Sequence, residues 1–192
     1  MNTAAGKIVS SDEERLILVD EDDREIGHLD KAACHDGAGI LHRAFSLFIF
    51  NRNGELLLQQ RSAGKRLWPL YWSNSCCSHP RLGESMVEAT ARRLQDELNI
   101  DAELEFVYKF IYRADFGSLG SEHELCWVYL GRGDRDATPN HNEIAATRNL
   151  AADRLDAELE DKPAAFTPWF KLEWQRLKRD YAPLLEKYSA PR

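Results

Sequence analysis

Two apolar runs separated by a short polar segment predict a β-hairpin in the first third of the chain. Residues 45–50 are apolar at five of six positions, and residues 55–60 contain three consecutive leucines. Residues 51–54, between the runs, read Asn, Arg, Asn and Gly. Asn and Gly favour tight turns because they accept backbone with positive φ. We therefore expect two strands joined by this turn.

A spacing of three to four residues predicts a helix over residues 85–98. The expected apolar stripe has spacings of four, three and four and consists of Val87, Ala91, Leu94 and Leu98. Glu84 lies near the positive N-terminal end of this helix, and Asn99 is suited to end it.

Alternating residues predict another strand pair, over about residues 106–113 and 122–130. Because side chains alternate along a strand, one face of the second strand carries Glu122, Glu124, Cys126 and Val128. Thr167 followed by Pro168 predicts the start of a helix that runs to about Lys187. This order of elements favours an α/β layer fold with a single domain, residues 1–192. Residues 1–15 are expected to be an N-terminal extension, either flexible or closed over a site.

Composition and charge narrow the class of protein. Hydrophobic residues make up 43% and charged residues 30% of the 192 residues, a balance typical of a globular protein. The net charge of −7 and the lack of a basic block argue against a nucleic-acid partner. No apolar segment approaches the roughly 18 to 20 residues that cross a bilayer. We expect a cytoplasmic protein without a membrane partner, since the first thirty residues do not resemble a signal peptide.

Histidines and carboxylates supply a candidate metal site. His35, His42 and His79, each taken alone, are more often ordinary surface or core residues. Together with Glu122 and Glu124 they offer three nitrogens and two carboxylates. This donor set suits Mn²⁺, Zn²⁺ or Mg²⁺ rather than a metal that prefers thiolates. Spacing alone leaves open whether the five residues converge.

Cys76 and Cys77 are candidate reactive thiols, and the residues alone do not distinguish between them. The four cysteines lack CxxC spacing, so we expect free thiols rather than disulfides or a zinc knot. A small buried hydrophobe is the commoner role of a free cysteine. Reactivity requires a lowered pKa, and a helix that begins after Gly83 is one source of such a shift.

The charged side chains of the predicted helix and several aromatic side chains can have either a structural or a functional role. Charges on the predicted helix are mostly expected on its solvated face, although carboxylates and arginines together also suit Mg²⁺ and a diphosphate. Aromatic residues are more often core than catalytic, unless an electron-rich ring faces a cation. The residues concerned are Arg92, Arg93, Asp96, Glu97, Tyr112, Trp127 and Trp169.

Taken in order, several segments resemble the type I isopentenyl-diphosphate isomerases of the Nudix superfamily. The resemblance covers about residues 16–170, and the ordered set is specific although each motif alone is weak. The motifs are Ala33-Cys34-His35, Leu41-His42-Arg43-Ala44-Phe45, Arg61-Ser62-Ala63-Gly64-Lys65, the run from Trp68 to Pro80, Leu82-Gly83-Glu84, Arg92-Arg93, Glu97-Leu98, Tyr112-Arg113-Ala114, Glu122-His123-Glu124 and Thr167-Pro168-Trp169. The resemblance implies a Nudix-type α/β/α sandwich with a mixed β-sheet and an added C-terminal helix.

The resemblance also implies a role for each matching position. The implied ligands of Mn²⁺, Zn²⁺ or Mg²⁺ are His35, His42, His79, Glu122 and Glu124. The implied diphosphate contacts are Lys31, Arg61, Lys65 and Arg93, with Mg²⁺ reaching the diphosphate through Glu97. Cys77, rather than Cys76, matches the catalytic cysteine of the family, Tyr112 and Glu124 belong to the acid side, and Trp169 faces the reacting carbons.

The sequence departs from the general Nudix pattern at three positions, and the departure at Arg93 favours the isomerase branch. Ser78 replaces a glycine, Asn99 stands where glycine is usual, and Arg93 replaces a glutamate that binds metal in pyrophosphate hydrolysis. The predicted reaction converts isopentenyl diphosphate to dimethylallyl diphosphate through a tertiary carbocation, in isoprenoid precursor synthesis. We expect the enzyme to be a monomer or a weak homodimer.

Two other functions remain open from the sequence. A Nudix pyrophosphohydrolase acting on a nucleotide-type diphosphate would hold Mg²⁺ with Glu84, Asp96 and Glu97. A non-catalytic metal-dependent binding module would bind metal and diphosphate yet tolerate the loss of Cys77.

Overall fold

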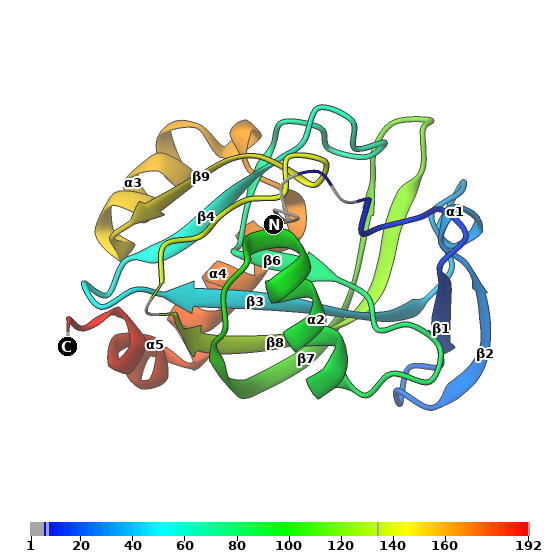
Figure 1. Cartoon of the computed structure of the whole chain (residues 1–192), viewed down its shortest axis with the longest axis horizontal. Helices are drawn as coiled ribbons and strands as arrows, with labels where there is room; N and C mark the ends of the chain where they lie inside the picture. The colour runs from blue at the N-terminus through cyan, green and yellow to red at the C-terminus, as the bar shows by residue number, and fades with distance from the viewer. Residues whose placement is uncertain (1–5, 7, 134, 192) are drawn as a thin grey trace.

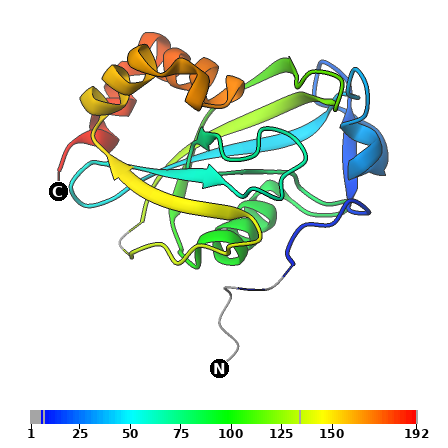
Figure 2. The same cartoon turned by 90° about the horizontal axis from the view of Figure 1, so that it is seen from above.

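The computed structural model describes residue 6, residues 8–133 and residues 135–191. Within these residues one mixed sheet is covered by helices on both faces (Figures 1 and 2). The strands are β1 (Arg15–Val19), β2 (Glu25–Asp30), β3 (His42–Phe50), β4 (Leu56–Arg61), β5 (Trp72–Ser73), β6 (Cys76–Ser78), β7 (Glu103–Asp115), β8 (Ser121–Arg132) and β9 (Ile144–Leu150). The helices are α1 (Lys31–Cys34), α2 (Met86–Leu98), α3 (Ala152–Asp161), the short 3₁₀ helix η2 (Pro163–Ala165), α4 (Pro168–Asp180) and α5 (Ala182–Ser189).

The sheet is organised around β3. On one side β3 pairs in parallel with β8 along its whole length, and on the other side it pairs antiparallel with β6. β8 pairs antiparallel with β7, while β4 pairs with β5 and β9. Side chains of β6, β3 and β8 that point to the same face therefore lie beside one another across the sheet.

The two faces of the sheet carry separate cores. Helix α2 covers one face, where it packs with Phe45 and Leu47 of β3. Helix α4 covers the other face, where Phe170 and Trp174 pack with Phe48. The predicted α/β/α arrangement is thus confirmed. None of the helices in the described ranges has an apolar stretch of the length that a bilayer demands.

Both predicted strand pairs are present, but the ladder of the first pair is short. The turn after β3 closes with hydrogen bonds from Gly54 N to Asn51 O and from Asn51 N to Glu55 O, as its composition predicted. The ladder of β3 and β4 contains one register pair, Phe50 with Leu56, because β4 turns away to pair with β9. The β7–β8 pair extends from Glu103 to Arg132 and is longer than predicted.

Helix α2 has the predicted ends but only part of the predicted buried face. Ser85 caps its start in a capping box with Glu88, and Asn99 ends it with φ of 53°. Of the predicted apolar stripe, Leu94 and Leu98 are buried as expected, but Val87 is 78% exposed and Ala91 is also exposed, so the first half of the stripe was wrong. The inward face consists of Ala89, Thr90, Arg93, Leu94, Glu97 and Leu98. The apolar spacing identified only Leu94 and Leu98 of this face, because a buried ion pair occupies part of it.

The predicted C-terminal helix is two helices. Helix α4 begins after Thr167 as expected, but α4 ends at Asp180 and α5 begins beyond Tyr181. Pro183 explains the break, because its ring lacks an N–H and clashes with the carbonyl four residues earlier in a continuous helix. The Thr167 hydroxyl does not cap α4 and instead lies 2.9 Å from the hydroxyl of Ser73.

Candidate active site

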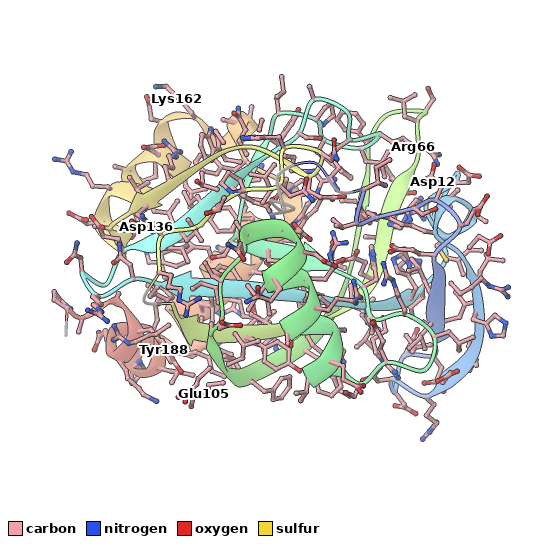
Figure 3. The ribbon with its side chains drawn as sticks, in the orientation of Figure 1. Asp12, Arg66, Glu105, Asp136, Lys162 and Tyr188 are labelled. Carbon is pink, nitrogen blue, oxygen red and sulfur yellow. The ribbon has the colours of Figure 1, made fainter. Side chains whose placement is uncertain are left out.

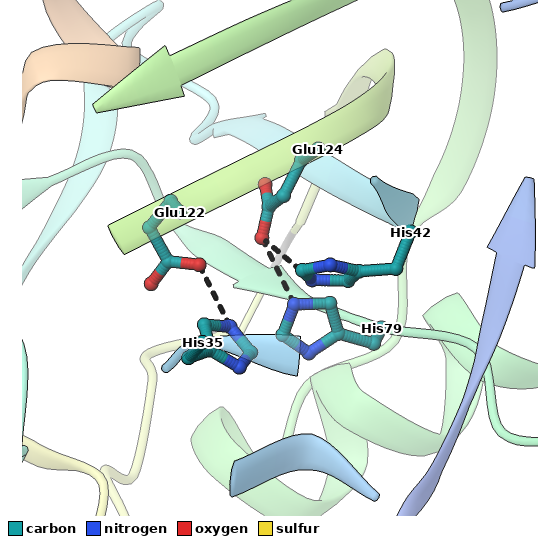
Figure 4. Close-up of side chains that lie close together, drawn as sticks. All are labelled: His35, His42, His79, Glu122 and Glu124. Atoms are coloured by element: carbon teal, nitrogen blue, oxygen red, sulfur yellow. Dashed lines mark hydrogen bonds and ion pairs between the residues drawn. The ribbon is translucent and has the colours of Figure 1, made fainter. Parts of the chain in front are cut away.

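Five predicted metal ligands converge at one end of β3. The nearest nitrogen or oxygen atoms of His35, His42, His79, Glu122 and Glu124 all lie within 4.8 Å of one another (Figure 4). His35 follows α1, His42 opens β3, His79 follows β6, and the two glutamates alternate on β8. Segments distant in the sequence thus build a single N/O donor set.

The histidine rings are oriented from outside the cluster. His35 Nδ1 lies 2.7 Å from the carbonyl of Lys31, and His42 Nδ1 lies 2.7 Å from the carbonyl of Ile40. When Nδ1 donates to a carbonyl, Nε2 of the neutral ring is free to accept or to bind a metal. His79 Nε2 lies 2.9 Å from Glu124 Oε1, and His35 Nε2 lies 2.8 Å from Glu122 Oε2.

The cluster fits a divalent cation. His42 is fully buried, and its Nε2 has no hydrogen-bond partner among the described residues. Leaving such a group unsatisfied costs about 1–3 kcal/mol, a cost that a metal bond removes. Burial and the neighbouring His35 lower the pKa of His42 to about 3, so its ring is neutral at physiological pH. Burial and the other two histidines likewise lower the pKa of His79.

The two carboxylates of the cluster differ in charge state. Burial tends to raise the pKa of Glu122, but the adjacent His35 outweighs it and holds this pKa below its usual range. Burial and the charge of Glu122 raise the pKa of Glu124 well above its usual range. Carboxyl groups whose environments push their pKa values apart suit different acid–base roles.

A cavity of about 270 Å³ adjoins the cluster and brings the predicted reactive groups together. Cys77, Tyr112, Glu124 and Trp169 line this cavity. Cys77 stands on β6 and Glu124 on β8, the strands on either side of β3, so the thiol and the carboxyl approach the cavity from different sides.

The predicted diphosphate contacts Lys31, Arg61, Lys65 and Arg93 line the same cavity, but Glu97 does not. Glu97 is buried, and its Oε1 accepts a hydrogen bond from Arg93 Nε at 2.7 Å. The Arg93–Glu97 pair lies one turn apart on α2. Both side chains are 3% exposed, so the expectation that such charges belong to a solvated face was wrong for this pair.

The backbone separates the two adjacent cysteines. Cys76 is buried in the core beneath α2, where its thiol lies 3.6 Å from Glu97 Oε1. Cys77 points to the opposite face and lines the cavity. Burial raises the pKa of Cys77 to about 12, with Arg61 opposing the rise. The expected lowering by a helix start was wrong, because Cys77 lies in β6 and α2 begins only at Met86.

Tyr112 and Trp169 complete the cavity wall. Tyr112 lies opposite Glu124 in the β7–β8 ladder, and its hydroxyl donates to Glu124 Oε2 at 2.6 Å. The Trp169 ring lies 6.3 Å from that of Tyr112, and the Arg61 guanidinium lies 5.3 Å from the Trp169 ring centroid. Arg61 donates to the carbonyls of Leu67 and Trp68, which fixes the cation over the indole.

Several groups beside Lys31, Lys65 and Arg93, the cationic end of the cavity, were not predicted from the sequence. Glu143 forms an ion pair with Lys65, and its Oε2 lies 3.4 Å from Arg93 Nη2. The Val9 carbonyl accepts a hydrogen bond from Arg93 Nη1 at 2.8 Å, and the Ser10 hydroxyl accepts one from Lys31. These residues carry no motif, and only their contacts reveal them.

The expected N-terminal extension falls partly outside the described residues. Residues 1–5 and 7 lie outside them, whereas residues 8–14 lead toward the site and Val9 is 5% exposed. Asp12 and Arg66, both labelled in Figure 3, line the cavity.

Comparison with known proteins identifies the family. The NUDIX domain family matches residues 40–170. Isopentenyl-diphosphate Delta-isomerase 1 of Photorhabdus laumondii is 40% identical over 170 residues, covering 88% of this chain and 97% of the relative. The chain belongs to the Nudix isopentenyl-diphosphate isomerases. The isopentenyl-diphosphate Delta-isomerase of Burkholderia multivorans agrees, at 42% identity over 177 residues, covering 92% of this chain and 98% of the relative.

Solved structures support the Nudix fold of this isomerase family member. The crystal structure of DR0079 from Deinococcus radiodurans matches with a TM-score of 0.70 at 26% identity, covering 86% of this chain and 100% of that one. A MutT protein from Methanosarcina mazei matches with a TM-score of 0.59 at 17% identity, covering 73% and 95%. The second match concerns the fold alone.

Proposed function

We propose that this chain converts isopentenyl diphosphate to dimethylallyl diphosphate by protonation and deprotonation, in isoprenoid precursor synthesis. One observation carries the proposal: a thiol, a tyrosine-bound carboxyl group and an indole line one cavity whose other end is cationic. The printed names of the curated relatives support the same reaction. A Nudix pyrophosphohydrolase is disfavoured because Arg93, an arginine held by Glu97, takes the place of a metal-binding glutamate.

We propose that the histidine–glutamate cluster holds Mn²⁺, Zn²⁺ or Mg²⁺ through His35, His42, His79, Glu122 and Glu124. The mixed nitrogen and oxygen donors support this ligand set, and so does His42 Nε2, which has no hydrogen-bond partner among the described residues. A cation bound there would fix the Glu124 carboxyl group and tune its acidity. Glu97, held by Arg93, is the proposed ligand of a second ion, Mg²⁺ carried by the diphosphate.

Protonation is assigned to the β7–β8 side of the cavity. An alkene is a poor base, so it needs a strong and well-placed acid. Glu124 delivers its proton, with Tyr112 relaying or orienting it through the 2.6 Å hydrogen bond, to the terminal carbon C4. The π electrons form the new C–H bond, and C3 becomes a tertiary carbocation. The Trp169 ring faces this charge with its electron-rich π system, and the buried walls exclude water.

Deprotonation is assigned to Cys77 on the β6 side. The Cys77 thiolate removes a proton from C2, and the C–H electrons become the new C2=C3 bond. Because burial raises the pKa of this thiol to about 12, the thiolate form depends on nearby cations, and Arg61 supplies one. Each turnover leaves the proton on Cys77 and the charge on Glu124, so a proton must pass back before the next cycle.

The cationic end of the cavity is the proposed diphosphate anchor. Lys31, Lys65 and Arg93 line it, and the diphosphate itself takes no part in the chemistry. Binding at this remote end positions the five-carbon tail between the acid and the base. We further propose a monomer or weak homodimer that works in the cytoplasm on a small-molecule substrate, and gel filtration tests the assembly.

The proposed function is tested by incubating the protein with isopentenyl diphosphate, Mg²⁺ and heavy water. Deuterium-labelled dimethylallyl diphosphate is the expected product. Cys77→Ala should lower kcat by at least roughly 10²-fold, since a positioned proton-transfer group contributes about 10²–10⁴. Cys34→Ala, which removes another buried thiol that does not line the cavity, is the matched control. Release of inorganic phosphate without alkene rearrangement would favour the hydrolase. Unlabelled, unchanged substrate, together with diphosphate binding that Cys77→Ala does not weaken, would favour a binding module.

A further inference from the structure

We propose that Leu67 determines the size of the alkyl group that the site accepts on the branched carbon of its substrate. The proposal rests on the isomerase function proposed above and extends it to substrate selection. It predicts that the protein discriminates between isopentenyl diphosphate and the homologue in which an ethyl group replaces the methyl group on C3.

Leu67 is an apolar residue of the cavity wall. Lys31, Lys65 and Arg93 mark the cationic end, which fixes the orientation of a diphosphate ester. Leu67 is 4% exposed, lines the cavity and belongs to the same apolar cluster as Tyr112 and Trp169. The proposal assigns to the Leu67 side chain the contact with an alkyl tail that is anchored by its diphosphate.

The backbone of Leu67 is held to the wall that carries Trp169. The Leu67 carbonyl accepts hydrogen bonds from Arg61 Nε at 3.3 Å and Arg61 Nη2 at 2.9 Å. The same guanidinium lies 5.3 Å from the Trp169 ring, and the next residue, Trp68, contacts that ring edge-on at 5.2 Å between centroids. Leu67 and Trp169 are thus fixed relative to each other by shared contacts.

The segment that follows Leu67 resists adjustment. Trp68 has φ of 46° and Leu70 has φ of 63°. Residues other than glycine adopt such left-handed backbone conformations only under constraint. A backbone held in this way does not easily move outward to enlarge the cavity.

The Leu67 side chain also has little room to turn away from the cavity. Its Cδ2 lies 3.4 Å from the place that a Cβ on Gly120 would occupy. Gly120 belongs to the turn between β7 and β8, and the same Cβ position is 2.3 Å from the carbonyl oxygen of His35. Leu67 therefore packs against a turn that is itself held against the α1 region.

A wall of this kind should penalise one extra methylene group. The ethyl homologue undergoes the same proton addition and removal, so only its fit differs. Apolar pockets discriminate by one methylene group with factors of about 10 to 200 in kcat/KM. Truncation of Leu67 should supply the missing space and remove most of that preference.

The experiment measures kcat/KM of the Mg²⁺-loaded protein for isopentenyl diphosphate and for 3-ethylbut-3-enyl diphosphate. We expect the wild type to prefer isopentenyl diphosphate by at least about tenfold, and Leu67→Ala to reduce this preference by about tenfold. Leu67→Met, which keeps the volume, is the matched control and should retain the preference within about threefold. Leu67→Val, a smaller truncation, should shift the ratio in the same direction if Leu67→Ala does not fold.

Two results separate the possible failures. Variants that still convert isopentenyl diphosphate but keep the wild-type ratio would overturn the role of Leu67, and so would a wild type without preference. A wild type that converts neither diphosphate would refute the proposed function and this inference together.

Discussion

Glu173 is a buried carboxyl group that is expected to make folding stability strongly dependent on pH. It lies on α4 with 0% exposure, and its Oε1 accepts a weak hydrogen bond from the Cys126 thiol at 3.5 Å. Its Oε2 has no partner in the described part of the chain. Burial raises the pKa of Glu173 from 4.5 to about 8, with Ser46 and Cys126 opposing the rise.

The raised pKa fixes the direction of the pH effect. Below pH 4.5 Glu173 carries its proton in both the folded and the unfolded state. Between pH 4.5 and about 8 the unfolded chain releases this proton while the folded chain keeps it. The free energy of unfolding therefore falls by about 1.4 kcal/mol per pH unit in this window. The loss reaches roughly 3 kcal/mol at pH 7 and is complete as pH rises through 8.

Glu173→Gln should remove this loss because the amide has the same shape and stays neutral. Relative to wild type, the variant should gain roughly 2–3 kcal/mol at pH 7 and nothing below pH 4.5. Urea denaturation at several pH values between 4.5 and 8 measures the difference. Glu105→Gln, at an exposed carboxylate paired with Lys187, is the control. A Glu173→Gln effect that is constant across this range would refute the assignment of a neutral buried acid.

Three further predictions follow from the site. Tyr112→Phe removes the hydroxyl bonded to Glu124 and should lower kcat roughly 10²-fold with little change in KM, as steady-state assays would show; an unchanged kcat would exclude Tyr112 from the acid side. Arg93→Met leaves Glu97 buried without its main partner and should destabilise the fold by about 3–5 kcal/mol in denaturant titrations. A loss near 1 kcal/mol would mean that the pair is not desolvated. Added Mn²⁺ or Zn²⁺ should raise the melting temperature of the wild type but much less that of His42→Ala, and equal shifts would argue against His42 as a ligand.

Local features of the fold could be predicted because they depend on neighbouring residues. The turn after β3 follows from its Asn and Gly residues, and the end of α2 follows from Asn99, which adopts positive φ. The inward face of β8 follows from simple alternation, since Cys126 and Val128 belong to the core beneath α4. Each of these outcomes requires only the chemistry of adjacent positions.

Predictions from apolar spacing or from a nearby helix start were wrong where contacts with distant elements determine burial and pKa. The buried face of α2 could be found only in part from apolar spacing, because Arg93 and Glu97 occupy it as a mutual ion pair beside Leu94 and Leu98. The pKa of Cys77 could not be inferred from a nearby helix start, because burial within the sheet dominates it. The roles of Glu143 and Glu173 had no signal in the sequence at all, since their contacts come from distant elements.

The chemical groups of the site could be read from the amino-acid sequence: which histidines, carboxylates, cations and aromatic rings are present, and which family pattern they resemble. The tertiary structure alone decided that they meet. Strand β3 carries His42 and lies between β6 and β8, so the sheet brings Cys77 and Glu124 to one cavity although 47 positions separate them. The physical reason is that hydrogen-bonded strands lie about 5 Å apart whatever their separation in the chain, so register, and not sequence distance, sets which side chains are neighbours.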